Sequence, residues 1–116
     1  MADMRDAVRV WRPAEFEYRP VGNAGMRYCN PIDPSLSDCR AGYLDIRGGS
    51  LEWTEKGDEI IWVLTGRVTI THGSTAYELG PGDIIFLRDG IALRMTGSDD
   101  ARIAWVSNLP PKGAPA

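Results

Sequence analysis

The sequence has few residues that bind metals or form disulfides. It contains two cysteines, Cys29 and Cys39, and one histidine, His72. The spacing of the cysteines is not that of a zinc site, and a single histidine cannot complete one. In a reducing compartment two such cysteines are most simply free thiols. We therefore expect neither a disulfide framework nor a zinc centre.

The sequence also lacks an excess of positive charge. It has 13 Lys and Arg against 16 Asp and Glu, a formal net charge of -3 and a pI of about 5.1. This balance disfavours binding to nucleic acid or to an anionic membrane surface. No stretch approaches the roughly 20 apolar residues of a membrane span, and the first ten residues are too charged for a signal peptide. We therefore expect a cytoplasmic protein with no nucleic-acid or membrane partner.

Turn-forming residues are abundant instead. The chain of 116 residues has 13 glycines and 8 prolines, and a chain of this length forms one domain with one continuous core. Many turns in a short chain imply many short strands. The last residues, 111–116, have little to bury, and we expect them to be disordered.

Apolar residues recur at alternate positions or in short runs, which is typical of strands. No segment has a convincing helical pattern, and 30–38, with two prolines, is predicted to be a loop. The continuous apolar runs 60–64 and 84–87 indicate strands covered on both faces. The strand spacing predicts an all-β jelly roll or barrel. The predicted strands are 8–11, 16–18, 26–29, 41–46, 51–55, 59–64, 67–72, 75–79, 84–87, 92–96 and 102–107.

Two segments resemble the motifs of the cupin superfamily. Residues 80–90 (GPGDIIFLRDG) resemble the second cupin motif. Glu59, followed by six residues and then Gly66, resembles the end of the first motif. The resemblance implies a double-stranded β-helix with a small-molecule pocket inside the barrel.

Within the cupins, the chain is similar to the ethanolamine-utilization (EutQ-type) cupin. The similarity rests on Trp53-Thr54, Asp58-Glu59, Val63-Leu64-Thr65-Gly66 and the final apolar strand 101–106. That family has been associated with an acetate-kinase activity, which requires acidic metal ligands. The present chain has Ile61 where the family usually has a second acid, which argues against that activity here.

The resemblance also implies a domain organisation. We expect a cupin barrel over 31–110, preceded by N-terminal strands and a loop in 1–30. The segment 8–18 is amphipathic and strand-like, and cupins commonly pair such strands across a two-fold axis. We therefore expect a homodimer in which these strands cover a sheet edge.

A typical cupin binds a divalent metal through His-x-His, a Glu and a later His. Here only the Glu is present, as Glu59. Two carboxylates are a weak metal site, so the resemblance implies a pocket without a tightly bound metal or other cofactor. The paired histidine positions hold Trp53 and Glu55, or Glu52 and Thr54 if the gap is one residue longer, and the later position holds Leu93.

The carboxyl groups of Glu55 and Glu59 are the candidate catalytic groups. Residues two apart in a strand share a face, so Trp53 and Glu55 point the same way, and Glu59 should face the same cavity. Two carboxyl groups in a partly apolar pocket raise each other's pKa, so one can serve as general acid and the other as base. Such a pair would also attract a cationic amine. The alternative for Glu55 is a solvated residue at the rim.

Strand alternation indicates further candidate residues. Tyr43 and Asp45 share a face and line the barrel if that face is inward, where Tyr43 can donate a proton; the alternative is a tyrosine at the core edge. Leu93 and Met95 take the inward positions of their strand. We interpret His72, at a hairpin tip, as an exposed turn residue.

The leading hypothesis is a metal-independent enzyme that transfers protons on a small polar metabolite, of isomerase, lyase or cyclase type. One alternative is a non-catalytic metabolite-binding or accessory protein, and a second is a metal cupin with unconventional ligands. In the leading hypothesis the catalytic residues are Glu59, Glu55 and Tyr43, and the substrate-binding residues are Trp53, Asp45, Leu93 and Met95.

Overall fold

The computed structural model describes residues 8–108, which form ten strands and one short 3-10 helix, η2 (Pro13–Glu15). The expected disordered tail, 111–116, lies outside the described residues. No helix of the described part is long and apolar enough to cross a membrane. The strands are β1 (Arg19–Pro20), β2 (Arg27–Ile32), β3 (Cys39–Asp45), β4 (Ser50–Thr54), β5 (Glu59–Thr65), β6 (Val68–His72), β7 (Thr75–Leu79), β8 (Ile84–Leu87), β9 (Ala92–Gly97) and β10 (Arg102–Asn108).

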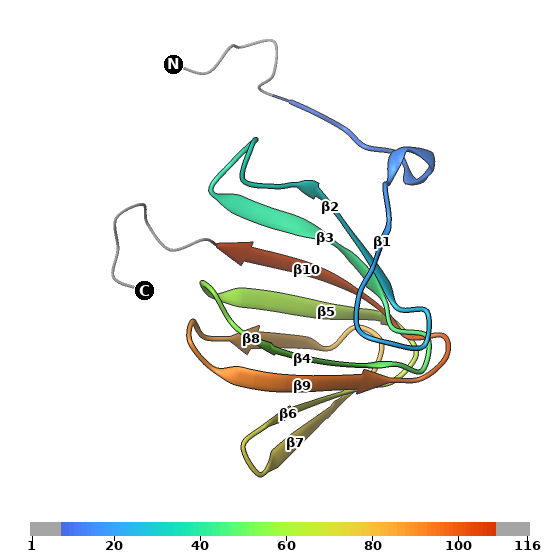
Figure 1. Ribbon diagram of the computed structural model, residues 1–116, viewed down its shortest axis with the longest axis vertical. Coiled ribbons are helices and arrows are strands. Elements are labelled where there is room, and N and C mark those ends of the chain that lie inside the picture. The colour runs from blue at the N-terminus through green and yellow to red at the C-terminus, as the bar shows by residue number, and fades with distance from the viewer. Residues whose placement is uncertain (1–7, 109–116) are drawn as a thin grey trace.

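The strands make two antiparallel sheets that pack face to face. The larger sheet has the order β1-β2-β3-β10-β5-β8, and the smaller has the order β4-β9-β6-β7. Figure 1 shows the β2–β3 pair at one end of the molecule and the β6–β7 hairpin at the other. The predicted all-β class is thereby confirmed.

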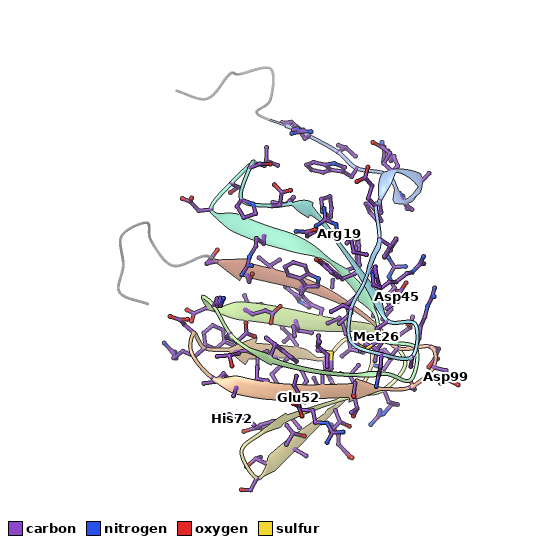
Figure 2. The ribbon with its side chains drawn as sticks, in the orientation of Figure 1. Arg19, Met26, Asp45, Glu52, His72 and Asp99 are labelled. Carbon is purple, nitrogen blue, oxygen red and sulfur yellow. The ribbon has the colours of Figure 1, made fainter. Side chains whose placement is uncertain are left out.

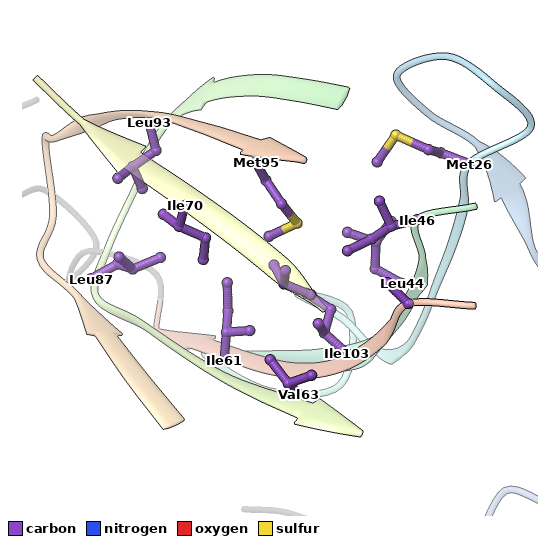
Figure 3. Packing of buried hydrophobic residues seen from close by; sticks show 12 residues of the cluster. Met26, Leu44, Ile46, Ile61, Val63, Ile70, Leu87, Leu93, Met95 and Ile103 are labelled. Carbon is purple, nitrogen blue, oxygen red and sulfur yellow. The ribbon is translucent and has the colours of Figure 1, made fainter. Parts of the chain in front are cut away.

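The core lies between the two sheets. Ile61, Val63 and Ile103 point inward from the larger sheet, and Ile70 and Met95 point toward them from the smaller one (Figure 3). All five side chains are almost fully buried. The alternation of buried and exposed positions along β5, β6, β9 and β10 follows the period of two that the sequence predicted.

The N-terminal strands are placed differently from the prediction. No strand forms over 8–18; the segment turns at η2 instead, where Pro13 occupies the first helical position. The Phe16 N–H donates to the Pro13 carbonyl at 3.2 Å, and the Arg12 N–H donates to Glu15 Oε1 at 3.0 Å. Proline favours such a turn start because its φ is already fixed near the helical value.

The segment 30–38, predicted as a loop, is partly a strand, since β2 continues to Ile32. Its pairing with β3 shifts register between Cys29 and Ile32. Pro31, which has no N–H to donate, falls within this irregular stretch, where a proline is tolerated. Beside it Gly42 is required, because a Cβ there would collide with the Cys29 carbonyl.

The outer face of the larger sheet is less covered than expected. Ile84 and Phe86 on β8 are 57% and 53% exposed in the single chain. They pair with Trp62 and Ile60 of β5, whose outward side chains are apolar as well. The predicted coverage of 84–87 on both faces is therefore not met within one described chain, and an apolar surface remains over β5 and β8.

Candidate functional site

Three polar residues lie in one row across the inner face of the larger sheet. In the register of β3, β10 and β5, Ser107 is opposite Arg40 on one side and Glu59 on the other. All three line a cavity of about 380 Å³ between the sheets. The row lies where β10 ends and β3 and β5 begin (Figure 1).

Glu55 completes this group from the opposite sheet. It follows β4, and its backbone is held by the turn before β9: its N–H donates to the Ile91 carbonyl at 2.9 Å, and its own carbonyl accepts from the Gly90 N–H at 3.0 Å. Its side chain lines the same cavity, and the residue is only 5% exposed. This burial contradicts the alternative of a solvated rim residue.

The two carboxyl groups affect each other. Burial, above all, and then the hydrogen bond and the charge of Glu55 raise the pKa of Glu59 from 4.5 to about 9. The Arg40 guanidinium and the Trp53 side chain act in the opposite direction but do not cancel the rise. Glu59 therefore holds a proton at neutral pH.

Apart from the hydrogen bond that the two carboxyl groups share, three polar atoms at this end of the cavity have no partner among the described residues. They are Arg40 Nε, Glu55 Oε2 and Glu59 Oε1, and all three are buried. The Arg40 side chain is anchored by a second nitrogen, Nη2, which donates to the Lys56 carbonyl at 3.2 Å. Buried polar groups are rarely left unpaired, so these three atoms mark a place for a polar ligand group or for water.

The rest of the cavity wall is mainly apolar. Trp105 neighbours Ile61 in the β10–β5 register, and Leu51 neighbours Met95 in the β4–β9 register, so both sheets contribute. The volume is within the range of small-molecule sites. The larger apolar residues that line it include Leu51, Trp53, Ile61, Met95, Ile103 and Trp105.

Four residues singled out from the sequence line this cavity: Glu55, Glu59, Trp53 and Met95. Leu93 does not line it. Leu93 is opposite Trp53 in the β4–β9 register and is 4% exposed, so it belongs to the packed core.

Tyr43 and Asp45 lie on the face of β3 that points away from the cavity. The prediction that they line the barrel is therefore wrong, because it required that face to point inward. Leu44, between them, is the residue that points into the cavity. The Tyr43 ring packs 5.4 Å from the ring of Phe16 and lies under the Arg102 guanidinium at 4.6 Å.

Asp45 pairs with arginine side chains instead of lining the cavity. Its carboxylate accepts a hydrogen bond from Arg27 Nε at 2.8 Å and lies 3.7 Å from Arg102 Nε and 3.9 Å from Arg47 Nη2. Figure 2 shows Asp45 at the end of β3, far from His72 at the end of the β6 strand. His72 is exposed, in agreement with its interpretation as a turn residue.

Sequence reasoning missed Arg40 and Ser107. A signal for both was present, because Ser107 continues the inward alternation of Ile103 and Trp105, and Arg40 continues that of Gly42 and Leu44. The pairing of β3 with β10 joins distant parts of the chain, however, and only this pairing brings the two residues beside Glu59.

The donor set does not fit the metal that many cupins bind. Across residues 8–108, no three His, Cys, Asp or Glu side chains are grouped as a metal site requires. Trp53 and Leu93 are apolar where the resemblance places histidines. The two carboxyl groups also share their end of the cavity with the Arg40 cation, which would oppose a second positive charge.

Comparisons with known proteins agree with this architecture. A family model described as the EutQ-like cupin domain matches residues 36–107. No curated protein matches the chain.

Solved structures with the same fold share little sequence with the chain. An ethanolamine utilization protein Q of Salmonella typhimurium is 19% identical, with a TM-score of 0.78 over 92% of this chain and 90% of that one. The Clostridium difficile EutQ protein is 20% identical, with a TM-score of 0.67 over 75% of this chain and 64% of that one.

The polyketide cyclase RemF of Streptomyces resistomycificus is 18% identical, with a TM-score of 0.73 over 89% of this chain and 80% of that one. At such identities the structural likeness establishes the fold alone. The family match spans more than half of the chain, and the chain therefore belongs to the family of EutQ-like cupin domains.

Proposed function

We propose that this protein is a metal-independent enzyme that performs acid–base chemistry on a small metabolite, of isomerase, lyase or cyclase type. One observation carries the proposal: two carboxyl groups, each with a buried oxygen, share the end of a cavity that is otherwise mainly apolar. The family and the cavity support the broader function of binding a small molecule.

The roles of the two carboxyl groups follow from the proton that Glu59 holds at neutral pH. Glu59, whose pKa is raised to about 9, is the general acid. Glu55, the other carboxyl group at this end of the cavity, is the general base. For a substrate with a C–H bond next to a carbonyl, Glu55 takes the proton from carbon while Glu59 gives its proton to the carbonyl oxygen, and an enol forms.

The charge balance of this step suits the site. One negative charge is present before and after the transfer, and it moves only from Glu55 to Glu59. The Arg40 guanidinium lies at the same end of the cavity and lowers the energy of either arrangement. Return of the proton from Glu55 to another carbon, while Glu59 takes back the enol proton, completes an isomerisation. In an elimination Glu55 instead gives its proton to a hydroxyl on the next carbon, which leaves as water while Glu59 takes back the enol proton.

Solvent hydrogen exchange tests this proposal. Protein and small ketones, such as 2-tetralone and 2-hydroxyacetophenone, are incubated in D₂O near neutral pD, and deuterium entry next to the carbonyl is followed by ¹H NMR. We expect exchange faster than in buffer, and a loss of about 100-fold or more in Glu59→Gln, as for removal of a general acid. Glu52→Gln is the control, because Glu52 is an exposed glutamate on β4.

A different result would contradict the proposal. If Glu59→Gln exchanges as fast as the unchanged protein, Glu59 is not the acid. If ketones bind to the cavity but never exchange, the protein is the non-catalytic metabolite-binding protein considered as the alternative.

A further inference from the structure

The charged residues gather at one end of the cavity, and this arrangement indicates what kind of ligand fits there. Arg40, Ser107, Glu59 and Glu55 meet at one end. Beyond them the wall is mainly apolar and comes from both sheets, with Trp53 and the Tyr28 ring among its residues. A ligand that fills the space therefore needs a mainly apolar body with its main polar group at one end.

The indole rings suggest the shape of that body. Trp53 comes from β4 in the smaller sheet and Trp105 from β10 in the larger one, so the two rings approach the cavity from opposite sheets. Both are only partly buried within the single chain, which leaves ring surface available to a ligand. Flat ring systems are the ligands that make the most contact with such surfaces.

The three unpartnered atoms describe the polar group. Arg40 Nε is a donor, whereas Glu55 Oε2 and Glu59 Oε1 are carboxyl oxygens. A matching ligand group must therefore accept one hydrogen bond and donate at least one. Amides, hydroxy ketones and enols have both capacities, whereas a carboxylate only accepts and an ammonium only donates.

The charges of the lining select against ionised groups. Arg40 and Glu55 offset each other, and Glu59 adds no charge when it holds the proton. Lys56, a further charged residue of the lining, is exposed, so water screens its charge. An ionised ligand would lose its hydration here without gaining an unpaired countercharge.

We propose that the site binds a neutral, ring-bearing molecule whose single polar group, of amide or hydroxy-carbonyl type, both accepts and donates hydrogen bonds beside Arg40, Glu55 and Glu59. This ligand class is narrower than the small polar metabolite that the sequence predicts, and it excludes the cationic amine. It rests on the site of the proposed function but does not require that the ligand be turned over.

A matched set of ligands tests the proposal. The probes are 2-naphthamide, 2-naphthoate and 2-naphthylmethylammonium, which share one ring system and differ in charge. Affinities are measured at pH 7 by ligand-observed NMR and calorimetry on the full chain. We expect the amide to bind at least about 10-fold more tightly than either ion, which corresponds to about 1.4 kcal/mol.

Two variants should change the preference in opposite directions. Glu55→Gln leaves the Arg40 charge without its counterpart, so the carboxylate should become the preferred probe. Arg40→Met leaves the Glu55 charge alone, so the ammonium should become preferred. Glu52→Gln should change neither, and thermal unfolding of each variant shows whether it is folded.

The proposal is overturned if the unchanged protein binds either ion as tightly as the amide, or binds none of the three. It is also overturned if a folded variant keeps the original order of preference. The amide has no proton for the enzyme to transfer from carbon, so this experiment reports binding alone. Tight amide binding without ketone exchange would contradict only the proposed function.

Discussion

The buried proton of Glu59 should make the stability of the protein depend on pH. Replacement of Glu59 by Gln keeps the size and the hydrogen-bonding capacity of the side chain but removes its titration. Glu59 is the acidic residue whose pKa the fold raises most clearly among the described residues, from 4.5 to about 9. The variant therefore isolates the contribution of this single group.

The sign of the change in unfolding free energy with pH follows from proton binding to Glu59. Between pH 4.5 and about 9 the folded state holds a proton on Glu59 that the unfolded state has released. The stabilisation is fully present below the unfolded pKa and is lost as the pH rises toward the folded pKa. One proton corresponds to about 1.4 kcal/mol per pH unit, so the free energy of unfolding should fall by at most about 3 kcal/mol from pH 6 to pH 8.

Urea unfolding at pH 6, 7 and 8 measures this effect. The slope of the unfolding free energy with pH is compared between the unchanged protein, Glu59→Gln and the exposed-site control Glu52→Gln. We expect the slope to disappear only in Glu59→Gln. Parallel pH profiles for the unchanged protein and Glu59→Gln would refute the conclusion that Glu59 is protonated in the folded state.

Three further substitutions test other parts of the structure. Asp45→Asn removes the carboxylate that pairs with Arg27 and should destabilise the fold by about 1–3 kcal/mol without weakening 2-naphthamide binding; a loss of binding alone would return Asp45 to the site. Gly42→Ala should cost about 2 kcal/mol or more in thermal or urea unfolding, because its Cβ meets the Cys29 carbonyl, and an unchanged midpoint would show that β2 does not approach β3 this closely. We expect the chain to pair with a second copy through the exposed apolar surface of β5 and β8; Phe86→Glu should then give a monomer by light scattering while Phe86→Leu does not, and a monomer for the unchanged protein at micromolar concentration would contradict this.

The sequence predicted much of the barrel because strand alternation is a local property. The strands from 41 onward lie close to their predicted positions, since turns at glycines separate them. The N-terminal segment was misjudged because its alternation resembles a strand, while Pro13 starts a turn that no partner strand opposes. Alternation alone does not distinguish a paired segment from an unpaired one.

The site was only partly predictable, for a related reason. Glu55 and Glu59 are near each other in the chain, so their meeting in one cavity could be expected. The face of β3 that points inward is set by its register with β10, which begins more than fifty residues later. Tyr43 and Asp45 were therefore assigned to the wrong face, and Arg40, on the correct one, was missed.

Glu59 keeps its proton at neutral pH beside Glu55, and ¹³C NMR measures this most directly. The side-chain carboxyl carbons of ¹³C-labelled glutamate are followed from pH 4 to pH 10, with Glu59→Gln used to assign the resonance. We expect the Glu59 signal to remain that of the protonated acid at pH 7 and to titrate near 9. A midpoint near 4.5, the value for an ordinary glutamate, would contradict the account.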